Sequence, residues 1–326
     1  SAASDVYKRQ ELYCSGHLIE AACTYYEATG KRKLLDIAVK NAECIYDRFV
    51  MQNTEGIPGH PEIELALLRL YRLTENKHFL ELAQKFINER GKAPDFWARE
   101  AKKRSWSVWN SDPWGNDYRQ SAKPVREQTE AVGHAVRAVY LYTGMADLAA
   151  ETEDKELFAA CRRLWENIVH RKMYITGGIG STVQGEAFTV DYDLPPDTAY
   201  SETCAAIGLI FFAEKMLENE INGEYGDVME LVFYNTVLAG MQLDGKRFFY
   251  VNPLEVDIGI SGKACTHSHV LPSRPKWYAC ACCPPNAARL IGSIGKYAYG
   301  EKGDTAYCHL FTSGKVSSVS YTHLRA

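Results

Sequence analysis

The chain has 326 residues and a formal net charge of −4, with 46% hydrophobic and 24% charged residues. Such a chain can bury a large core, in one big domain or two. The composition is that of a globular protein and lacks the basic surplus of a nucleic-acid partner, and no apolar run suits a membrane span or a secretory leader. Ten cysteines are too sparse for a disulfide scaffold, which favours a reducing compartment and a cytoplasmic protein.

Both ends differ from the rest of the chain. Residues 1–10 carry no amphipathic pattern, and residues 316–326 fit nothing before them. Both resemble translated adapter sequence, so we interpret them as a non-native leader and a non-native tail and exclude them from fold reasoning. An ordinary disordered terminus is the alternative. The first interpretation implies a natural protein that is longer at both ends.

Residues 11–169 have the pattern of helical hairpins. The predicted pairs are 17–29 with 34–49, 62–71 with 79–87, and 131–142 with 157–168, the last with a break at Thr143-Gly144. Each first helix ends in Tyr-x-x-Thr and carries Gly-His at or near its start, at 16–17, 59–60 and 133–134. This internal repeat fits either an open α-solenoid or a closed toroid of hairpins.

The segment 92–128 interrupts the hairpins and is too long for a plain connection, which indicates a functional loop. It is rich in tryptophan, at Trp97, Trp106, Trp109 and Trp114. These aromatic rings either line a sugar-binding cleft or pack the loop itself.

After residue 174 the pattern changes. The Gly-rich turn 176–181 precedes neither Lys-Ser nor a βαβ unit, which argues against a phosphate-binding loop. Helices are predicted at 199–217, 225–241 and 286–299, a short strand within 246–253, and a strand at 304–311. This gives about nine substantial helices, whereas a toroid of six hairpins needs twelve, so N-terminal helices would be missing.

Three thiols lie within four residues at Cys280, Cys282 and Cys283, directly before Pro284-Pro285. The prolines predict a helix start, where the helix dipole favours thiolate. Glu202 and Cys204 open another predicted helix. Glu202, Cys204, Cys282 and Cys283 could together form a site with three sulfurs and one oxygen, a ligand set that zinc accepts. Isolated buried thiols, or a zinc that only staples two segments, are the alternatives.

Four motifs in order carry a family resemblance: Tyr174-Ile-Thr-Gly-Gly-Ile-Gly-Ser181, Gly185-Glu186-Ala-Phe, Tyr200-Ser-Glu202-Thr-Cys204 and Cys280-Ala-Cys282-Cys283-Pro-Pro-Asn286. Over residues 11–315 the chain resembles glycoside hydrolase family 127, the β-L-arabinofuranosidases. The resemblance implies a mainly α fold, an incomplete (α/α)6 helical toroid over residues 11–300, followed at 301–315 by the start of a C-terminal β-sandwich domain.

The resemblance also implies roles for single residues. Zinc (Zn²⁺) would be held by Glu202, Cys204, Cys282 and Cys283, with Cys282 as the nucleophile and Glu186 as the general acid/base. The residues implied to contact the sugar are His17, His60, His134, Glu230 and Tyr250. The substrate would be an arabinose-containing oligosaccharide or glycan, and a homodimer of the full-length parent is a further expectation. The role of Cys280 stays open.

Three other interpretations are kept. Glu186 with one of Asp191, Asp193 and Asp197 could form a carboxylate pair that inverts the anomeric centre. A helical-repeat carbohydrate-binding module with a structural zinc would show no catalysis. A toroid sugar epimerase using His60 and His134 would isomerise free sugar without cleaving glycosides.

Overall fold

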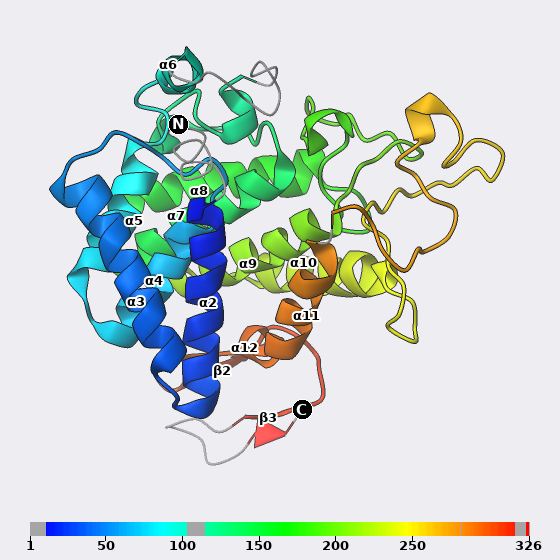
Figure 1. Ribbon diagram of the computed structural model, residues 1–326. Helices are drawn as coiled ribbons and strands as arrows, with labels where there is room; N and C mark the ends of the chain where they lie inside the picture. Colours follow the sequence, from blue (N-terminus) through cyan, green and yellow to red (C-terminus); the bar gives the residue numbers. More distant parts are fainter. Residues whose placement is uncertain (1–10, 103–114, 281, 317–323, 326) are drawn as a thin grey trace. The chain divides into compact units, whose positions relative to one another are not determined.

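The structure is a computed structural model that describes residues 11–102, 115–280, 282–316 and 324–325. The chain forms two compact units, Ser1–Ile168 and Val169–Ala326, and each is described by itself (Figure 1). Trp106, Trp109 and Trp114, like most of the predicted leader and tail, lie outside the described residues. None of the described helices is both long and apolar enough for a membrane span.

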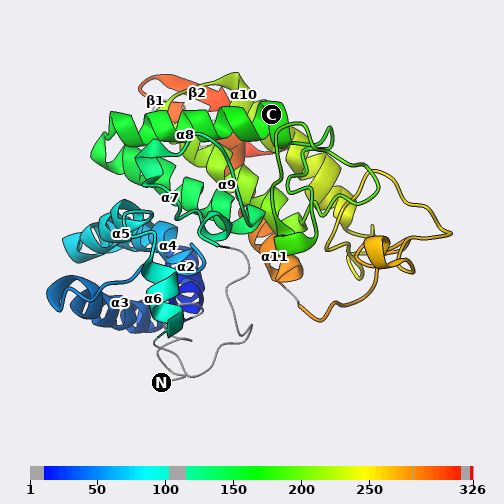
Figure 2. The ribbon, with the colours of Figure 1, turned by 90° about the horizontal axis from the view of Figure 1, so that it is seen from above.

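The first unit consists of helical hairpins, as the hydrophobic spacing predicts. Helix α2 packs on α3, α4 on α5, and α7 on α8, and α4 also contacts α2 and α7 (Figure 2). The bounds are Leu12–Thr29 for α2, Lys33–Tyr46 for α3, Ile63–Thr74 for α4, Lys77–Glu89 for α5, Phe96–Lys102 for α6, Ala135–Thr152 for α7 and Lys155–Asn167 for α8.

The ends of three helices in this unit share one chemistry. Thr29, Thr74 and Thr152 close α2, α4 and α7, and each donates its Oγ1 hydrogen to the carbonyl oxygen four residues earlier, at 2.6, 2.7 and 2.7 Å. The residue after each threonine is left-handed, with φ of 68°, 56° and 54°. A left-handed residue here stops a helix by turning the chain back.

The break predicted at Thr143-Gly144 is wrong, because α7 continues through both residues to Thr152. Thr143 is buried and donates its hydroxyl to the Val139 carbonyl at 2.7 Å, within the helix. A Cβ on Gly144 would lie 3.2 Å from Cβ of Glu64 in α4. Gly144 therefore serves the close packing of two helices and does not end one.

Trp97 in the long interruption is a core residue. It is buried, donates its indole N–H to Ser121 Oγ at 3.1 Å, and lies under the Arg119 guanidinium at 4.7 Å. These contacts support the packing interpretation for this tryptophan and not a sugar-lined surface.

The second unit is organised on α9, Thr203–Asn219, which is buried around most of its circumference, as expected for a helix with so little charge. Helix α10, Gly223–Val232, and helix α11, Cys283–Ser293, both pack on α9. A π-helical turn, Phe233–Leu238, continues α10, and α12 spans Gly295–Ala298.

Strands are few and short in the described residues. Strand β1, Tyr299–Lys302, pairs antiparallel with β2, Thr305–Cys308, and β3, Lys315–Val316, with β4, Leu324–Arg325. The strand predicted within 246–253 is wrong: this segment forms only the isolated bridges of Val251 with Glu202 and of Phe248 with Met241. The predicted domain boundaries and the start of a β-sandwich stay predictions.

The prediction of about nine substantial helices agrees with the described residues. The described residues contain eleven α-helices against about nine predicted, and nine of the eleven have ten residues or more. The two short helices are α6, which has seven residues and lies in the interruption 92–128, and α12, which has four residues. Helix α12 lies within the helix predicted at 286–299, which the structure divides into α11 and α12.

Replacing Gly91 with alanine should lower the free energy of unfolding by about 3 kcal/mol or more, because φ is +82° and a Cβ would lie 2.0 Å from the Lys123 carbonyl oxygen. Gly30→Ala is the matched control: φ is +68°, but nothing lies within 4 Å of the added Cβ, so the expected cost is about 1 kcal/mol. Urea denaturation measures both. Equal losses would contradict the steric argument.

Candidate functional site

A rigid turn places Glu202 and Cys204 at the start of α9. Asn252 donates from its backbone N and from Nδ2 to the Ser201 carbonyl, at 3.1 and 3.0 Å. Thr203 donates its backbone N–H to the Tyr250 carbonyl at 3.0 Å. Glu202 is the N-cap residue of α9, although its side chain makes no capping hydrogen bond. Two segments about fifty residues apart in the sequence therefore hold this turn in place.

The Gly-rich turn 176–181 packs against the turn that precedes α9. Ser201 is fully buried with a positive φ of 39°, and its N–H donates to the Gly180 carbonyl at 2.8 Å. A Cβ on Gly178 would lie only 2.0 Å from Ser201 Oγ. The glycines thus make room for the strained residue next to Glu202, which is a structural role and agrees with the absence of a phosphate-loop motif.

Cys282 and Cys283 come from the other end of the site. Cys282 is the N-cap residue of α11 and Cys283 its first residue, followed by proline at the positions where a helix tolerates it. The helix start predicted from Pro284-Pro285 is therefore confirmed. Because α11 packs on α9, the two helix starts bring the cysteines to Glu202 and Cys204.

The four predicted ligands meet in the second unit. One ligand atom from each of Glu202, Cys204, Cys282 and Cys283 lies within 4.8 Å of the other three. The Sγ atoms of Cys204 and Cys283 are 3.5 Å apart, and those of Cys282 and Cys283 3.9 Å. Oε1 of Glu202 lies 3.6 Å from Cys282 Sγ and 3.9 Å from Cys283 Sγ.

These separations fit a tetrahedral metal ion. With zinc–sulfur bonds of about 2.3 Å and a zinc–oxygen bond of about 2.1 Å, tetrahedral ligands would be separated by about 3.8 Å for two sulfurs and about 3.6 Å for sulfur and oxygen. Oε2 of Glu202 is buried with no hydrogen-bond partner among the described residues. The ligand geometry, the thiol-rich chemistry and this buried carboxylate oxygen all suit a zinc ion.

The charges of the group point the same way. Burial, together with Cys282 and Glu186, raises the pKa of Glu202 well above its usual value. Burial also raises the pKa of the Cys283 thiol. Hydrogen bonds with Cys204 and Cys283 lower the pKa of Cys282, so Cys282 is the preferred thiolate. Without a cation, the group favours a single negative charge. A bound dication would stabilise further deprotonated ligands.

Glu186 lies beside this group. Its carboxylate and that of Glu202 approach within 4.8 Å, and Tyr200 donates its hydroxyl hydrogen to Glu186 Oε1 at 2.7 Å. Glu186 has a positive φ of 52°, rare for a non-glycine residue and frequent at functional sites. Its neighbour Gly185, with φ of 72°, shares this turn. The left-handed backbone and the Tyr200 hydrogen bond together set the direction of the Glu186 side chain.

Two tyrosines connect Glu186 with Cys282. The Tyr250 hydroxyl lies 3.2 Å from Cys282 Sγ, and the rings of Tyr200 and Tyr250 are 6.2 Å apart. Burial raises the pKa of both phenols, so both remain neutral hydrogen-bond donors. Tyr250 was a predicted site residue. Tyr200 was missed as one, although it stands in the motif that contains Glu202 and Cys204.

The predicted histidines lie together in the first unit. Tyr13 contacts His17 and His60 at ring distances of 4.4 and 4.5 Å, and the rings of His60 and His134 are 5.8 Å apart. Tyr118 lies 5.6 Å from His134. The Gly-His repeat therefore brings three imidazoles together, with two tyrosines that the sequence did not reveal.

The remaining candidate residues differ in their contacts. Glu230 lies in α10, and no described contact joins its side chain to the four-ligand group. Asp191 pairs with Arg171 at 2.9 Å and Asp197 with His267 at 3.0 Å. These contacts occupy both carboxylates and disfavour an inverting pair built from them. Cys280 Sγ lies 4.0 Å from Cys282 Sγ.

Comparison with known proteins agrees with this geometry. The family model described as "Beta-L-arabinofuranosidase, GH127 catalytic domain" matches residues 2–296. A curated relative from Bifidobacterium longum subsp. longum, the non-reducing end beta-L-arabinofuranosidase, is 44% identical over 326 residues, which is 97% of this chain and 49% of that protein.

Solved structures give the same result. A GH127 β-L-arabinofuranosidase from Geobacillus stearothermophilus T6 matches with a TM-score of 0.89 and 50% identity, over 95% of this chain and 49% of that chain. A second GH127 β-arabinofuranosidase matches with a TM-score of 0.79 and 42% identity, over 94% and 44%. The predicted fold class is confirmed. This chain spans about half the length of these relatives.

Proposed function

This chain belongs to the GH127 β-L-arabinofuranosidase family, and from this premise we propose that it is the catalytic part of a retaining glycosidase that releases terminal β-L-arabinofuranosyl residues. The observation that carries the proposal is the group of Cys282, Glu202, Cys204 and Cys283 with Glu186 beside it. It combines a low-pKa thiol with a carboxyl group in a polar, partly buried setting, the two functions that a double displacement needs.

In the proposed reaction Glu186 first acts as the acid. It gives its proton to the glycosidic oxygen while Cys282 Sγ attacks the anomeric carbon, so the carbon–oxygen bond breaks and a carbon–sulfur bond forms. Glu186, now a carboxylate, takes a proton from water, and the water oxygen displaces Cys282 Sγ. Two displacements at one carbon retain its configuration. Tyr200 orients the Glu186 carboxyl and Tyr250 hydrogen-bonds the Cys282 sulfur.

Zinc is the proposed metal, held by Glu202, Cys204, Cys282 and Cys283. When bound, it keeps coordinated thiols deprotonated at neutral pH. Glu202 and Cys204 from α9, with Cys282 and Cys283 from α11, would also tie two helix starts together, so that a structural role accompanies the chemical one.

Sugar recognition is proposed for His17, His60, His134, Glu230 and Tyr250, as the family resemblance implies. Imidazole, carboxylate and phenol groups all exchange hydrogen bonds with hydroxyls. The substrate class, an arabinose-containing oligosaccharide or glycan, is part of the same proposal. The cytoplasmic location and the homodimer of the full-length parent stay predictions.

The first experiment measures metal content and hydrolysis of p-nitrophenyl β-L-arabinofuranoside, on this chain and on a version extended at both ends. We expect about one zinc per chain and, in at least the extended version, cleavage that a strong chelator removes and added zinc restores. Zinc without cleavage in either version would contradict the proposal and favour the carbohydrate-binding module. Isomerised free arabinose without cleavage would favour the epimerase.

A further inference from the structure

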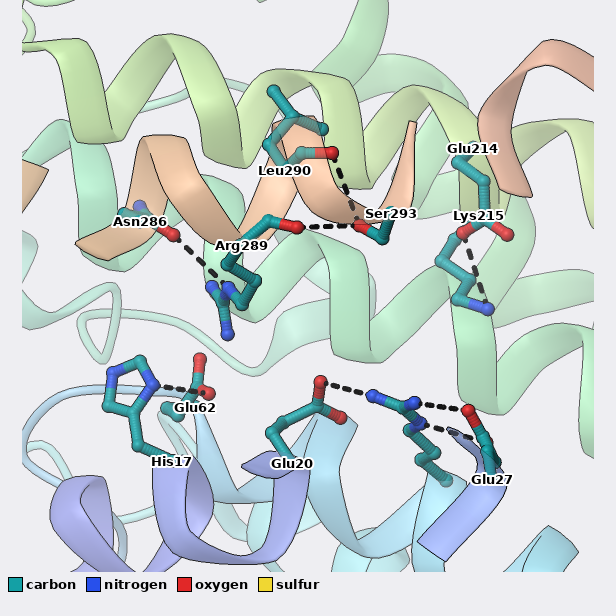
Figure 3. A network of polar contacts seen from close by, with 11 residues as sticks. His17, Glu20, Glu27, Glu62, Glu214, Lys215, Asn286, Arg289, Leu290 and Ser293 are labelled. Atoms are coloured by element: carbon teal, nitrogen blue, oxygen red, sulfur yellow. Dashed lines mark hydrogen bonds and ion pairs between the residues drawn. The ribbon is translucent and has the colours of Figure 1, made fainter. Parts of the chain in front are cut away.

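A buried carboxylate contacts one histidine of the cluster in the first unit. Oε1 of Glu62 lies 3.0 Å from Nδ1 of His17, and the two side chains point toward each other in Figure 3. We infer that Glu62 is a positioning residue that fixes the ring and the tautomer of His17 for hydrogen bonding to the sugar. The inference rests on the proposed function, which makes His17 a sugar contact.

The position of Glu62 is unusual for a helix start. It is the N-cap residue of α4 with φ of −177°, yet its side chain makes no capping hydrogen bond to that helix. The side chain is fully buried, and burying a carboxylate is costly unless hydrogen bonds compensate. His17 supplies such a contact from the neighbouring helix α2.

Gly16 lets the two helices approach closely enough for this contact. A Cβ there would lie 2.7 Å from Cγ of Glu62 and 2.8 Å from the backbone N of Ile63. The two residues of the Gly-His pair at 16–17 thus act together: Gly16 leaves room for the Glu62 side chain, and His17 contacts its carboxylate.

The contact decides which nitrogen of His17 carries the proton. A carboxylate accepts hydrogen bonds, so the nitrogen that faces it, Nδ1, is the one that bears hydrogen. The neutral ring then has its lone pair on Nε2. The His17 side chain is 36% exposed. Nε2 can therefore accept a hydrogen bond from a hydroxyl group.

The other two histidines have tautomers that local contacts set in the same way. His60 Nδ1 lies 2.7 Å from the Pro61 carbonyl and must donate, which leaves an acceptor at Nε2. His134 Nδ1 accepts from the Arg137 backbone N–H at 3.2 Å, so its Nε2 carries the proton when the ring is neutral. His17 and His60 thus each carry an acceptor at Nε2, which suits the hydroxyl hydrogens of a sugar.

His17 differs from His60 and His134 in the kind of group that sets its tautomer. Backbone groups set the tautomers of His60 and His134, whereas a side chain sets that of His17, and side chains can be substituted. The hydrogen-bond acceptor at Nε2 of His17 therefore depends on the carboxylate of Glu62. Glu62→Gln keeps the shape and removes the charge, and its amide can turn either its oxygen or its nitrogen toward Nδ1.

A double-mutant cycle tests the inference in the active version of the protein. Glu62→Gln should lower kcat/KM for p-nitrophenyl β-L-arabinofuranoside by about tenfold, mainly through KM, as expected for the loss of a partner that orients a binding group. In a His17→Ala background the same substitution should change kcat/KM by less than about twofold, because its effect runs through His17. If Glu62→Gln lowered kcat/KM by the same factor in the His17→Ala background as in the unsubstituted protein, the inference would be overturned.

Asp147→Asn is the matched control. Asp147 is also a buried carboxylate of the first unit, but it pairs with Arg72 at the opposite end of α4, at 2.6 Å. This variant should lower the melting temperature while its effect on kcat/KM stays the same with and without His17. If Glu62→Gln also had the same effect on kcat/KM with and without His17, the role of Glu62 would be purely structural and the inference would be overturned.

A second measurement does not need activity. In protein labelled with ¹⁵N-histidine, the imidazole shifts of His17, assigned by their absence in His17→Gln, should show a protonated Nδ1, and Glu62→Gln should shift the population toward a protonated Nε2. A protonated Nε2 in the unsubstituted protein, or shifts unchanged by Glu62→Gln, would overturn the inference. If no version cleaves the substrate, the proposed function fails, and these shifts still decide the tautomer.

Discussion

Cys282→Ser is expected to lower kcat for arabinofuranoside hydrolysis by at least about 10³-fold. A serine hydroxyl is not ionised at neutral pH, whereas hydrogen bonds with Cys204 and Cys283 lower the pKa of the Cys282 thiol. The variant loses the attacking atom while the other three ligands, Glu202, Cys204 and Cys283, stay in place. Steady-state kinetics with metal content measured on the same samples checks it.

Cys265→Ser is the control for this substitution. Cys265 is an exposed thiol of the same unit, in a short 3-10 turn, and its replacement should leave kcat, KM and zinc content unchanged. Intact-protein mass spectrometry with a slowly hydrolysed arabinofuranoside should show an adduct on Cys282 in the unsubstituted protein and none in Cys282→Ser. Turnover close to normal in Cys282→Ser would exclude the thiolate as nucleophile.

Glu186→Gln is expected to lower kcat by about 10²–10⁴-fold, with the size depending on the leaving group. An amide cannot supply the proton that the glycosidic oxygen needs, although it can still accept the Tyr200 hydrogen bond of 2.7 Å that holds the side chain. Nitrophenolate leaves without full protonation, so the loss should be smaller for nitrophenyl arabinofuranosides than for an arabinose disaccharide. Comparing kcat/KM for the two substrates measures this.

The control for this substitution is Glu218→Gln, which removes an exposed carboxylate paired with Lys215 at the end of α9. It should leave kcat/KM unchanged for both substrates. Tyr200→Phe keeps Glu186 but removes its hydrogen bond, and a loss smaller than that of Glu186→Gln is expected. Equal losses with both leaving groups in Glu186→Gln would show that this residue is not the acid, and one of the nearby carboxyl groups would have to replace it.

The amino-acid sequence was sufficient to predict most of the helices. Apolar residues at helical spacing located the hairpins of the first unit, and Pro284-Pro285 located the start of α11. Two local predictions failed because contacts with residues distant in the chain overrode the local pattern. Thr143-Gly144 is typical of a helix end but lies inside α7, because Gly144 packs closely on Glu64 of α4. Residues 246–253 suggest a strand, but they pair with the turn at Glu202 as an irregular segment.

The candidate site divides in the same way. The spacing of Glu202 with Cys204 and of Cys282 with Cys283 already indicated two halves of a metal site at two helix starts. Their distances depend on the packing of α11 on α9 and on the hydrogen bonds from Thr203 and Asn252 across about fifty residues. The family motifs named Glu186 but gave no sign of Tyr200 as the residue that holds it.

By itself, the sequence of this protein determined its helical class, the helix starts and the residue types available for chemistry, because helix periodicity, proline geometry and thiol chemistry are local properties. Tertiary structure alone decided which groups meet: the Gly178 space that admits Ser201, the Gly16 space that admits Glu62, and the burial that shifts the pKa values around Cys282. Close approach and desolvation depend on residues distant in the chain, and no local pattern encodes them.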